Sequence, residues 1–204
     1  MKKRALFSIL ILFLISCNGK SDKVIVKSEK DTSILYYKNN GVKDSIASIF
    51  FNKGLDNKSD RKFKKALIYF QKSDSIEPRN VTILNSLGTI YSDLKDSDKA
   101  YNYYYKAIEI DSTYPHTYLN LGFEYNHNKK REKAIEILKK GLSIEHNTER
   151  KGYFNYNIAN ALYKLGKYDE SEMYNNTALD LVQDREIRDL IYELKNAIES
   201  EKNN

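Results

Sequence analysis

The histidines, the cysteine and the glycines of this 204-residue chain are the residues that could take part in chemistry. His116, His127 and His146 are the three histidines, and none stands near a carboxylate or cysteine at metal-ligand spacing. His116 and His127 are eleven residues apart on one predicted helix, so they share a face but lie three turns apart, too far for one metal ion. No glycine-rich phosphate loop is present. We therefore expect no metal, no cofactor, no small-molecule substrate and no enzymatic activity.

The single cysteine, Cys17, follows a segment typical of bacterial export signals. Residues 2–4 are basic, and residues 5–15 are apolar apart from one serine, a run too short for a transmembrane helix of about 20 residues. Leu14-Ile15-Ser16-Cys17 resembles the lipobox of bacterial lipoproteins, in which the signal is cut before the cysteine and the thiol is acylated. The resemblance implies a signal peptide over residues 1–16 and a lipid anchor, such as palmitate, on Cys17. An ordinary secretory signal with an incidental cysteine is the alternative.

A lipid anchor would hold the protein in the bacterial cell envelope, with the outer membrane favoured over the inner. Two or three acyl chains anchor stably, whereas one alone is marginal. Residues 17–43 would then form the lipidated N-terminus and a tether, because this stretch is polar and contains Gly19, Gly41 and Asn39-Asn40. As a flexible coil it would span ~30 Å. Two short apolar runs, residues 24–26 and 34–37, are either strands or segments that pack on the helices.

The overall charge argues against a nucleic-acid partner. The formal charge is +6, but without the three basic residues of the signal 31 basic and 28 acidic side chains remain, so the charge falls to +3. Nucleic-acid-binding domains carry a pronounced basic face. One cysteine also excludes an internal disulfide framework.

Two stretches of the chain repeat the same residue types at an offset of 34. The first carries Leu84, Leu87, Gly88, Tyr91, Ala100, Tyr104 and Ala107. The second carries Tyr118, Leu121, Gly122, Tyr125, Ala134, Leu138 and Gly141. Each copy predicts a helix hairpin in which Gly88 or Gly122 allows close approach, Ala100 and Ala107 receive the first helix, and Tyr104 fills the space behind. A fixed period of this length indicates that such hairpins stack and complete each other's core.

This pattern resembles the tetratricopeptide repeat, in which an aromatic residue, Leu-Gly and Tyr are followed by Ala, an aromatic residue and Pro. The resemblance implies an all-α, right-handed superhelix with four repeats over residues 44–183. The repeats are expected at about residues 47–80, 81–114, 115–148 and 152–185. The first copy rests on Phe50, Gly54, Phe63, Ala66, Phe70 and Pro78.

The first and last copies depart from the pattern. Lys53 and Asn57 replace the Leu and Tyr of the first copy, and Asn155 replaces the first aromatic residue of the fourth. We expect Phe154 to take over that packing role. Three extra residues precede the fourth copy and should lengthen a turn or a helix end.

Capping residues predict where the helices begin and end. Asp60, Asp96 and Asn128 are good N-cap types near the start of the second helices, and Leu165-Gly166 is a predicted helix stop. Residues 184–204 are expected to form a capping helix and tail. Its apolar face should dock on the fourth repeat and consists of Ile187, Leu190, Ile191, Leu194, Ala197 and Ile198.

In proteins with this repeat, ligands lie along the first helices. The corresponding residues here predict a protein-binding groove of polar and aromatic side chains: Asn85, Asn120, Phe123, His127, Tyr153, Tyr156, Asn157, Asn160, Tyr163 and Lys164. Asn120 and Asn157 could pair with the backbone of an extended peptide, or could merely follow the family consensus. The groove lacks the cations with which some family members hold a terminal carboxylate.

These features together predict a membrane-anchored protein-binding adaptor or assembly factor of the cell envelope. The alternative is a structural spacer or oligomerisation unit with no dedicated peptide ligand.

Overall fold

The computed structural model describes residues 11–13, 23–28, 31–36 and 41–203. The chain divides into two compact units, residues 1–42 and 43–204. In the first unit, strands β1 (Ile11–Phe13), β2 (Lys23–Ser28) and β3 (Asp31–Tyr36) form an antiparallel sheet in the order β1-β2-β3, with Ile25 opposite Ile34. Residues 24–26 and 34–36 of the two apolar runs therefore lie in strands, which is one of the two alternatives for these runs. Cys17 lies outside the described residues.

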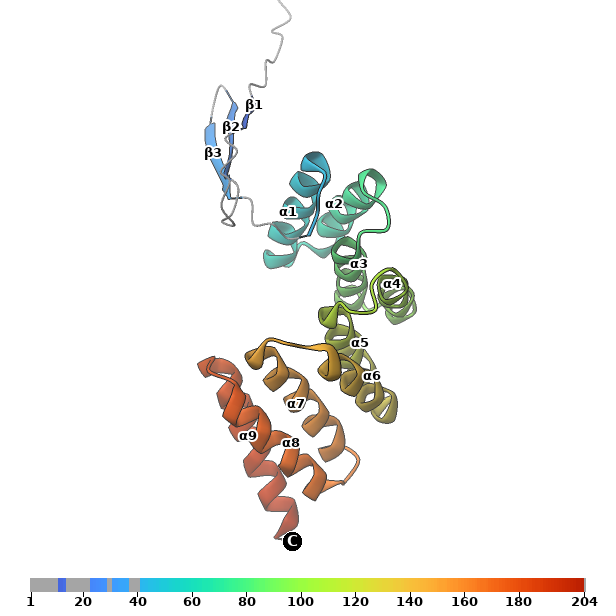
Figure 1. Cartoon of the computed structure of the whole chain (residues 1–204), viewed down its shortest axis with the longest axis vertical. Coiled ribbons are helices and arrows are strands. Elements are labelled where there is room, and N and C mark those ends of the chain that lie inside the picture. Colours follow the sequence, from blue (N-terminus) through green and yellow to red (C-terminus); the bar gives the residue numbers. More distant parts are fainter. Residues whose placement is uncertain (1–10, 14–22, 29–30, 37–40, 204) are drawn as a thin grey trace, which may run out of the picture. The chain divides into compact units, whose positions relative to one another are not determined.

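The second unit is all-α, as predicted. Its helices are α1 (Ser45–Ser59), α2 (Phe63–Ile76), α3 (Val81–Asp93), α4 (Ser97–Ile110), α5 (Pro115–His127), α6 (Arg131–Ile144), α7 (Thr148–Tyr163), α8 (Tyr168–Leu181) and α9 (Arg185–Lys202). They pair as hairpins α1/α2, α3/α4, α5/α6 and α7/α8, and α9 packs mainly on α8 (Figure 1). The four predicted hairpins and the predicted last helix are thus present.

One packing device recurs in the first three hairpins. A glycine of the first helix lies against a large side chain of the second: Gly54 against Phe70, Gly88 against Tyr104 and Gly122 against Leu138. A Cβ atom on Gly88 would lie 2.5 Å from the Tyr104 ring. Ala100 and Ala107 are fully buried, as expected, but Tyr104 packs directly on Gly88 rather than behind the alanines.

In the fourth hairpin, Phe154 takes over the packing role of the missing aromatic residue, as predicted. Phe154 is fully buried and lies against Gly141 of α6, while the Asn155 side chain donates to the Lys151 carbonyl. The three extra residues lengthen a helix end, because α7 has 16 residues and α5 has 13.

The helix starts differ in part from the prediction. Asp96 caps α4 by accepting from the Lys99 amide, but Asp60 and Asn128 are the C-caps of α1 and α5. Helices α2 and α6 begin two residues later, after Lys62 and Lys130, which stand 34 residues on either side of Asp96. For α2 and α6, the 34-residue offset from Asp96 therefore predicts the helix start better than the capping preference of Asp60 and Asn128 does.

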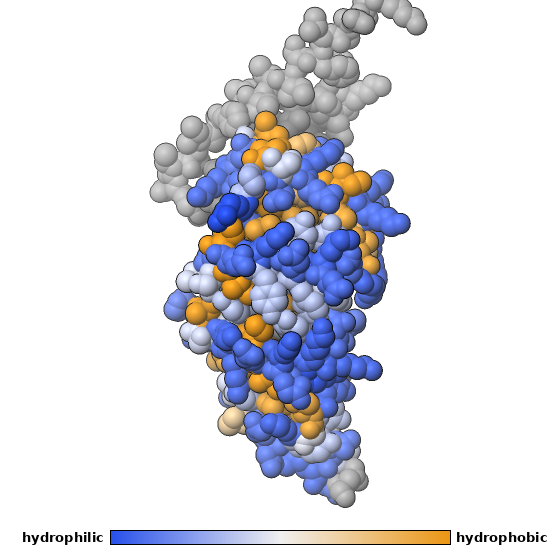
Figure 2. Space-filling model, turned by 90° about the vertical axis from the view of Figure 1, so that its right-hand side faces the viewer, coloured by the Kyte–Doolittle hydropathy of each residue, from blue (hydrophilic) through white to orange (hydrophobic). Residues whose placement is uncertain are grey.

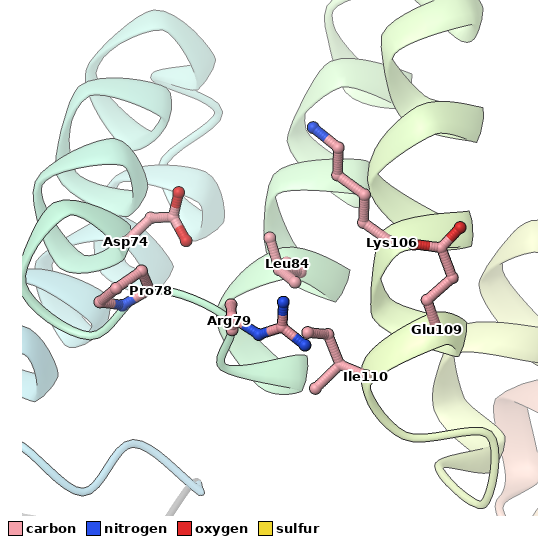
Figure 3. Close-up of a pocket in the computed structure, with 7 residues that line it drawn as sticks. All are labelled: Asp74, Pro78, Arg79, Leu84, Lys106, Glu109 and Ile110. Carbon is pink, nitrogen blue, oxygen red and sulfur yellow. The ribbon is translucent and has the colours of Figure 1, made fainter.

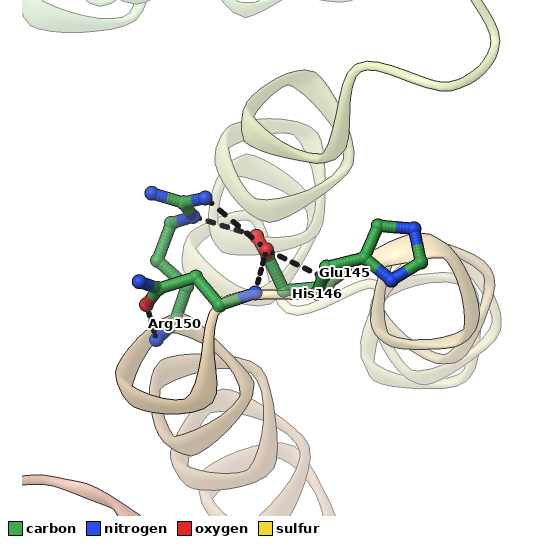
Figure 4. Close-up of polar contacts among 4 residues, drawn as sticks. Glu145, His146 and Arg150 are labelled. Atoms are coloured by element: carbon green, nitrogen blue, oxygen red, sulfur yellow. Dashed lines mark hydrogen bonds and ion pairs between the residues drawn. The ribbon is translucent and has the colours of Figure 1, made fainter.

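An ion pair between the buried Glu145 carboxylate and the partly exposed Arg150 guanidinium joins the third hairpin to the fourth. The Glu145 side chain is 1% exposed and accepts from Arg150 Nε at 2.7 Å and from the amides of His146 at 2.8 Å and Asn147 at 2.7 Å (Figure 4). These bonds hold the turn between α6 and α7, and so fix how the two hairpins meet. The predictions did not include this contact.

Helix α9 buries only part of its predicted apolar face. Ile191, Leu194 and Ile198 are buried, Ile187 and Ala197 are half-buried, and Leu190 is 42% exposed. Leu190 was expected in the docked face, and that expectation is wrong. The Arg188 guanidinium donates to the carbonyls of Leu179 and Val182 at the end of α8, which ties the helix down.

Candidate functional site

The first helices of successive hairpins contact one another, α3 with α5 and α5 with α7, and so form a continuous groove wall. On this wall, at its C-terminal end, lies a pocket of about 410 Å³. Its lining comes from four helices: Phe123, Asn126 and His127 of α5, Arg131 of α6, Tyr156, Asn157 and Asn160 of α7, and Leu190 of α9. Below, "groove pocket" means this set.

The lining of the groove pocket combines apolar and polar side chains. Phe123 is 55% exposed and Leu190 is 42% exposed. Most of the molecular face in Figure 2 is hydrophilic, with small apolar patches. The rings of Phe123 and His127 stack with centroids 6.4 Å apart. Arg131 Nη1 donates to the Asn126 side-chain oxygen at 2.8 Å, which holds the guanidinium in the pocket wall. Two exposed apolar groups beside oriented amides are typical of a binding surface.

Among the residues that the structure describes, no carboxylate lines the groove pocket. The acidic residue of α5, Glu124, is 2% exposed, accepts from the Ser92 hydroxyl, and accepts from Asn128 Nδ2 at 2.8 Å. Burial alone raises the pKa of Glu124, but the hydrogen bonds from Ser92, Ser97 and Asn128 outweigh it and hold that pKa below its ordinary value. Glu124 therefore stays charged and serves to join α3, α4 and α5.

Five of the predicted groove residues meet in this pocket: Phe123, His127, Tyr156, Asn157 and Asn160. The Asn157 side chain donates to the Tyr153 carbonyl of its own helix, so part of its amide is already used. The prediction did not include Arg131 and Leu190. Arg131 belongs to a second helix, and Leu190 was assigned to the docked face of the capping helix.

Asn85 and Asn120 lie outside the groove pocket and bind each other. Asn120 Nδ2 donates to Asn85 Oδ1 at 3.1 Å and lies 3.4 Å from Thr89 Oγ1. Thr89 in turn accepts from the Tyr104 hydroxyl. These amides join α3 to α5, which is a structural use of the groove asparagines.

Tyr153, Tyr163 and Lys164 also lie outside the pocket. Tyr153 packs against the buried cluster of Ala178, Val182 and Ile191, and Tyr163 packs against the cluster of Ala159, Leu194 and Ile198. Lys164 Nζ lies 4.9 Å from the centre of the Tyr163 ring. These residues therefore do not line the accessible part of the groove, which lies nearer to α5.

A second pocket, of about 380 Å³, lies between α2, α3 and α4 (Figure 3). Asp74, Arg79, Lys106 and Glu109 line it together with Pro78, Leu84 and Ile110. Burial raises the pKa of Asp74, while Lys106 opposes that shift. With two cations and two carboxylates its charges balance, and it favours no ligand class as clearly as the groove pocket does.

The described residues hold no group of three or more His, Cys, Asp or Glu side chains that could bind a metal ion. His116 is half-buried, and burial, followed by the nearby Arg150 charge, lowers its pKa. In the same part of the chain, none of the helices has the length and apolar character needed to cross a membrane.

Comparison with solved structures identifies the fold. PilF of Pseudomonas aeruginosa is 18% identical with a TM-score of 0.66, over 75% of this chain and 71% of that chain. PilW, a type IV pilus biogenesis factor, is 18% identical with a TM-score of 0.62, over 68% and 63% of the two chains. The first repeat domain of Spaghetti (RPAP3), solved with an HSP90 peptide, is 21% identical with a TM-score of 0.52, over 62% and 95%. At these identities the likeness shows the fold alone.

Family models agree with the structure. No curated protein matches the sequence of this chain. One model of the tetratricopeptide repeat matches residues 81–114, and another matches residues 115–148 and 153–183. These segments coincide with α3/α4, α5/α6 and α7/α8. Residues 81–148 and 153–183 are therefore tetratricopeptide repeats, and the helical unit that contains them is a solenoid of this type.

Proposed function

We propose that the protein is a membrane-anchored adaptor or assembly factor of the bacterial cell envelope, which binds a protein or extended peptide in the groove pocket. The observation that carries this proposal is the pocket itself. Exposed Phe123 and Leu190 face a site that also contains Tyr156 and the side chains of Asn126, Asn157 and Asn160. Exposed aromatic and aliphatic groups of this kind are typical anchors of protein interfaces. PilW, which shares the fold, is a type IV pilus biogenesis factor, and this supports a role as an assembly factor.

Photo-crosslinking tests this binding site. A photoreactive residue at Phe123 should give crosslinks to a defined envelope protein, because Phe123 is 55% exposed in the pocket. A photoreactive residue at Ile68, which is 50% exposed on α2, serves as the matched control. The Leu190→Ala substitution should weaken the crosslink from Phe123 while helicity and melting stay unchanged. If both positions give the same products, or neither gives any, the structural spacer is the better interpretation.

The anchor is a separate part of the proposal and rests on the lipobox. Cys17→Ala should lower the share of the protein in the membrane pellet, because acylation of the thiol is the proposed attachment. Metabolic labelling with a palmitate analogue should mark the parent and not the variant. A parent protein that takes up no label would contradict lipid anchoring and leave the groove proposal standing.

A further inference from the structure

The turn between the two helices of each hairpin contains a residue in the left-handed backbone region. Arg61, Lys95 and Lys129 have φ angles of 59°, 65° and 61°, and Gly166 has a φ of 73° at the corresponding turn of the fourth hairpin. The first three are spaced by 34 residues, so they occupy the same repeat position. Glycine adopts this conformation freely, whereas a side chain with a Cβ atom is strained there.

In three hairpins, therefore, a residue with a long cationic side chain occupies a strained backbone conformation in the turn. Asparagine and aspartate tolerate this region better than lysine or arginine, and glycine avoids the strain altogether, as Gly166 shows. Strained residues of this kind concentrate where a structure binds something. Arg79, in the turn between the first two hairpins, is the other such residue of the described chain and lines the pocket of Figure 3.

These three cations are available to a partner. Arg61, Lys95 and Lys129 are exposed, and among the described residues none forms an ion pair with them. Neighbouring lysines differ, because Lys62 pairs with Asp60 and Lys99 pairs with Asp96, each at 2.7 Å. Positive charge at these three positions is therefore not explained by pairing within the protein.

The turns adjoin one another and form one edge. A shallow depression of about 410 Å³ joins the first turn to the second and is lined by Arg61, Lys62, Phe63, Lys64, Lys65 and Leu94. Asn128 Nδ2 donates to Ser97 Oγ at 3.1 Å and joins the second turn to the third, beside exposed Lys129 and Lys130. We call this set the basic edge: Arg61, Lys62, Lys64, Lys65, Lys95, Lys129 and Lys130.

We propose that the basic edge binds the anionic lipid headgroups of a membrane surface. Its cations are exposed and spread along three hairpins, which suits a surface of distributed negative charge better than a single acidic ligand. Half-buried Phe63 and Leu94 lie among the cations and supply the apolar contact that an interfacial site uses. This contact uses neither the groove pocket nor an acyl chain on Cys17. A lipid anchor would add to it, because stable membrane attachment takes two signals.

Glycine substitution separates this binding from folding. The variant Arg61→Gly, Lys95→Gly, Lys129→Gly removes three cations and also removes the strain, so it should melt at or above the temperature of the parent. Both chains would start at residue 17 and carry Cys17→Ser, so that neither the signal segment nor a lipid contributes. Sedimentation with vesicles of phosphatidylglycerol and phosphatidylcholine at low salt should show binding weakened between tenfold and roughly 100-fold.

A matched variant controls for net charge. Lys72, Lys106 and Lys140 also recur at 34-residue spacing in the same hairpins but stand on the second helices, away from the turns. Lys72→Gln, Lys106→Gln, Lys140→Gln should keep most of the vesicle binding. The proposal fails if the parent binds phosphatidylcholine vesicles equally well, if it binds neither kind, or if the two triple variants lose binding to the same extent. A partner that is an acidic protein would give the second of these results.

Discussion

Single polar residues fix the joints between the hairpins, and Glu145 is the clearest case. Its carboxylate is nearly inaccessible to solvent and accepts from Arg150 and two backbone amides. Burial alone raises the pKa of Glu145, but the bonds from Arg150, Asn147 and His146 together hold it below its ordinary value. A charged group with this many partners stabilises the joint only while it stays ionised.

The contribution of Glu145 to stability should therefore depend on pH. Because its pKa is lower folded than unfolded, the contribution is complete above the unfolded value of about 4.3 and is lost as the pH falls through the folded value. Glu145→Gln should lower the free energy of unfolding by about 1–2 kcal/mol at pH 7, since Arg150 is partly exposed. Urea unfolding of both proteins at pH 7, 5, 4 and 3 measures the difference, which should shrink toward pH 3.

Glu136 supplies the control for this measurement. It forms an ion pair with Lys140 at 2.7 Å, but both side chains are more than half exposed. Glu136→Gln should change the unfolding midpoint little at any of these pH values. An equal loss in both variants would show that general charge, and not the Glu145 joint, governs the acid sensitivity.

At the scale of the helix, two neighbouring residues of α9 have different roles, one in the core and one at the groove pocket. Ile191 is fully buried against Ala178 and Val182, whereas Leu190 is 42% exposed and lines the groove pocket. Ile191→Ala should cost about 2–4 kcal/mol and lower the melting temperature, because it leaves a cavity under the last helix. Leu190→Ala should leave melting nearly unchanged and weaken crosslinking from Phe123. The reverse pattern would mean that α9 docks through a different face.

The sequence predicted the helices correctly where a residue type has a single structural role. Leu-Gly pairs, alanines and the 34-residue offset predicted the hairpins, because close packing allows few substitutions there. Asp60 and Asn128 misled, since aspartate and asparagine suit helix ends as well as helix starts. The groove was predicted in part: Phe123, His127 and Tyr156 meet in the pocket, but Leu190 and Arg131 come from helices outside the repeat's ligand positions. Tertiary contacts determine whether these residues line the pocket, and the same holds for Asn120 and Tyr163, which lie outside it.

At the scale of the whole helical unit, stability should be distributed along the chain of hairpins. Each hairpin packs on its sequence neighbours, α2 on α3, α4 on α5 and α6 on α7. In such an array the loss of one hairpin affects its neighbours first and distant hairpins least. A terminal hairpin has one neighbour and an internal hairpin has two, so equal damage at the two places should have unequal effects.

Gly54 and Gly88 allow this comparison, because both face an aromatic ring. An added Cβ atom would lie 2.5 Å from Phe70 in the first hairpin and 2.5 Å from Tyr104 in the second. Alanine otherwise favours a helix over glycine by about 1 kcal/mol, so a net loss of about 1–3 kcal/mol would show that the clash dominates. Hydrogen exchange should report loss of protection confined to α1 and α2 for Gly54→Ala. For Gly88→Ala it should spread through α3 and α4 into α2 and α5. Uniform loss across all hairpins in the Gly54 variant would mean that the unit unfolds as one cooperative block, and the additive picture would then be wrong.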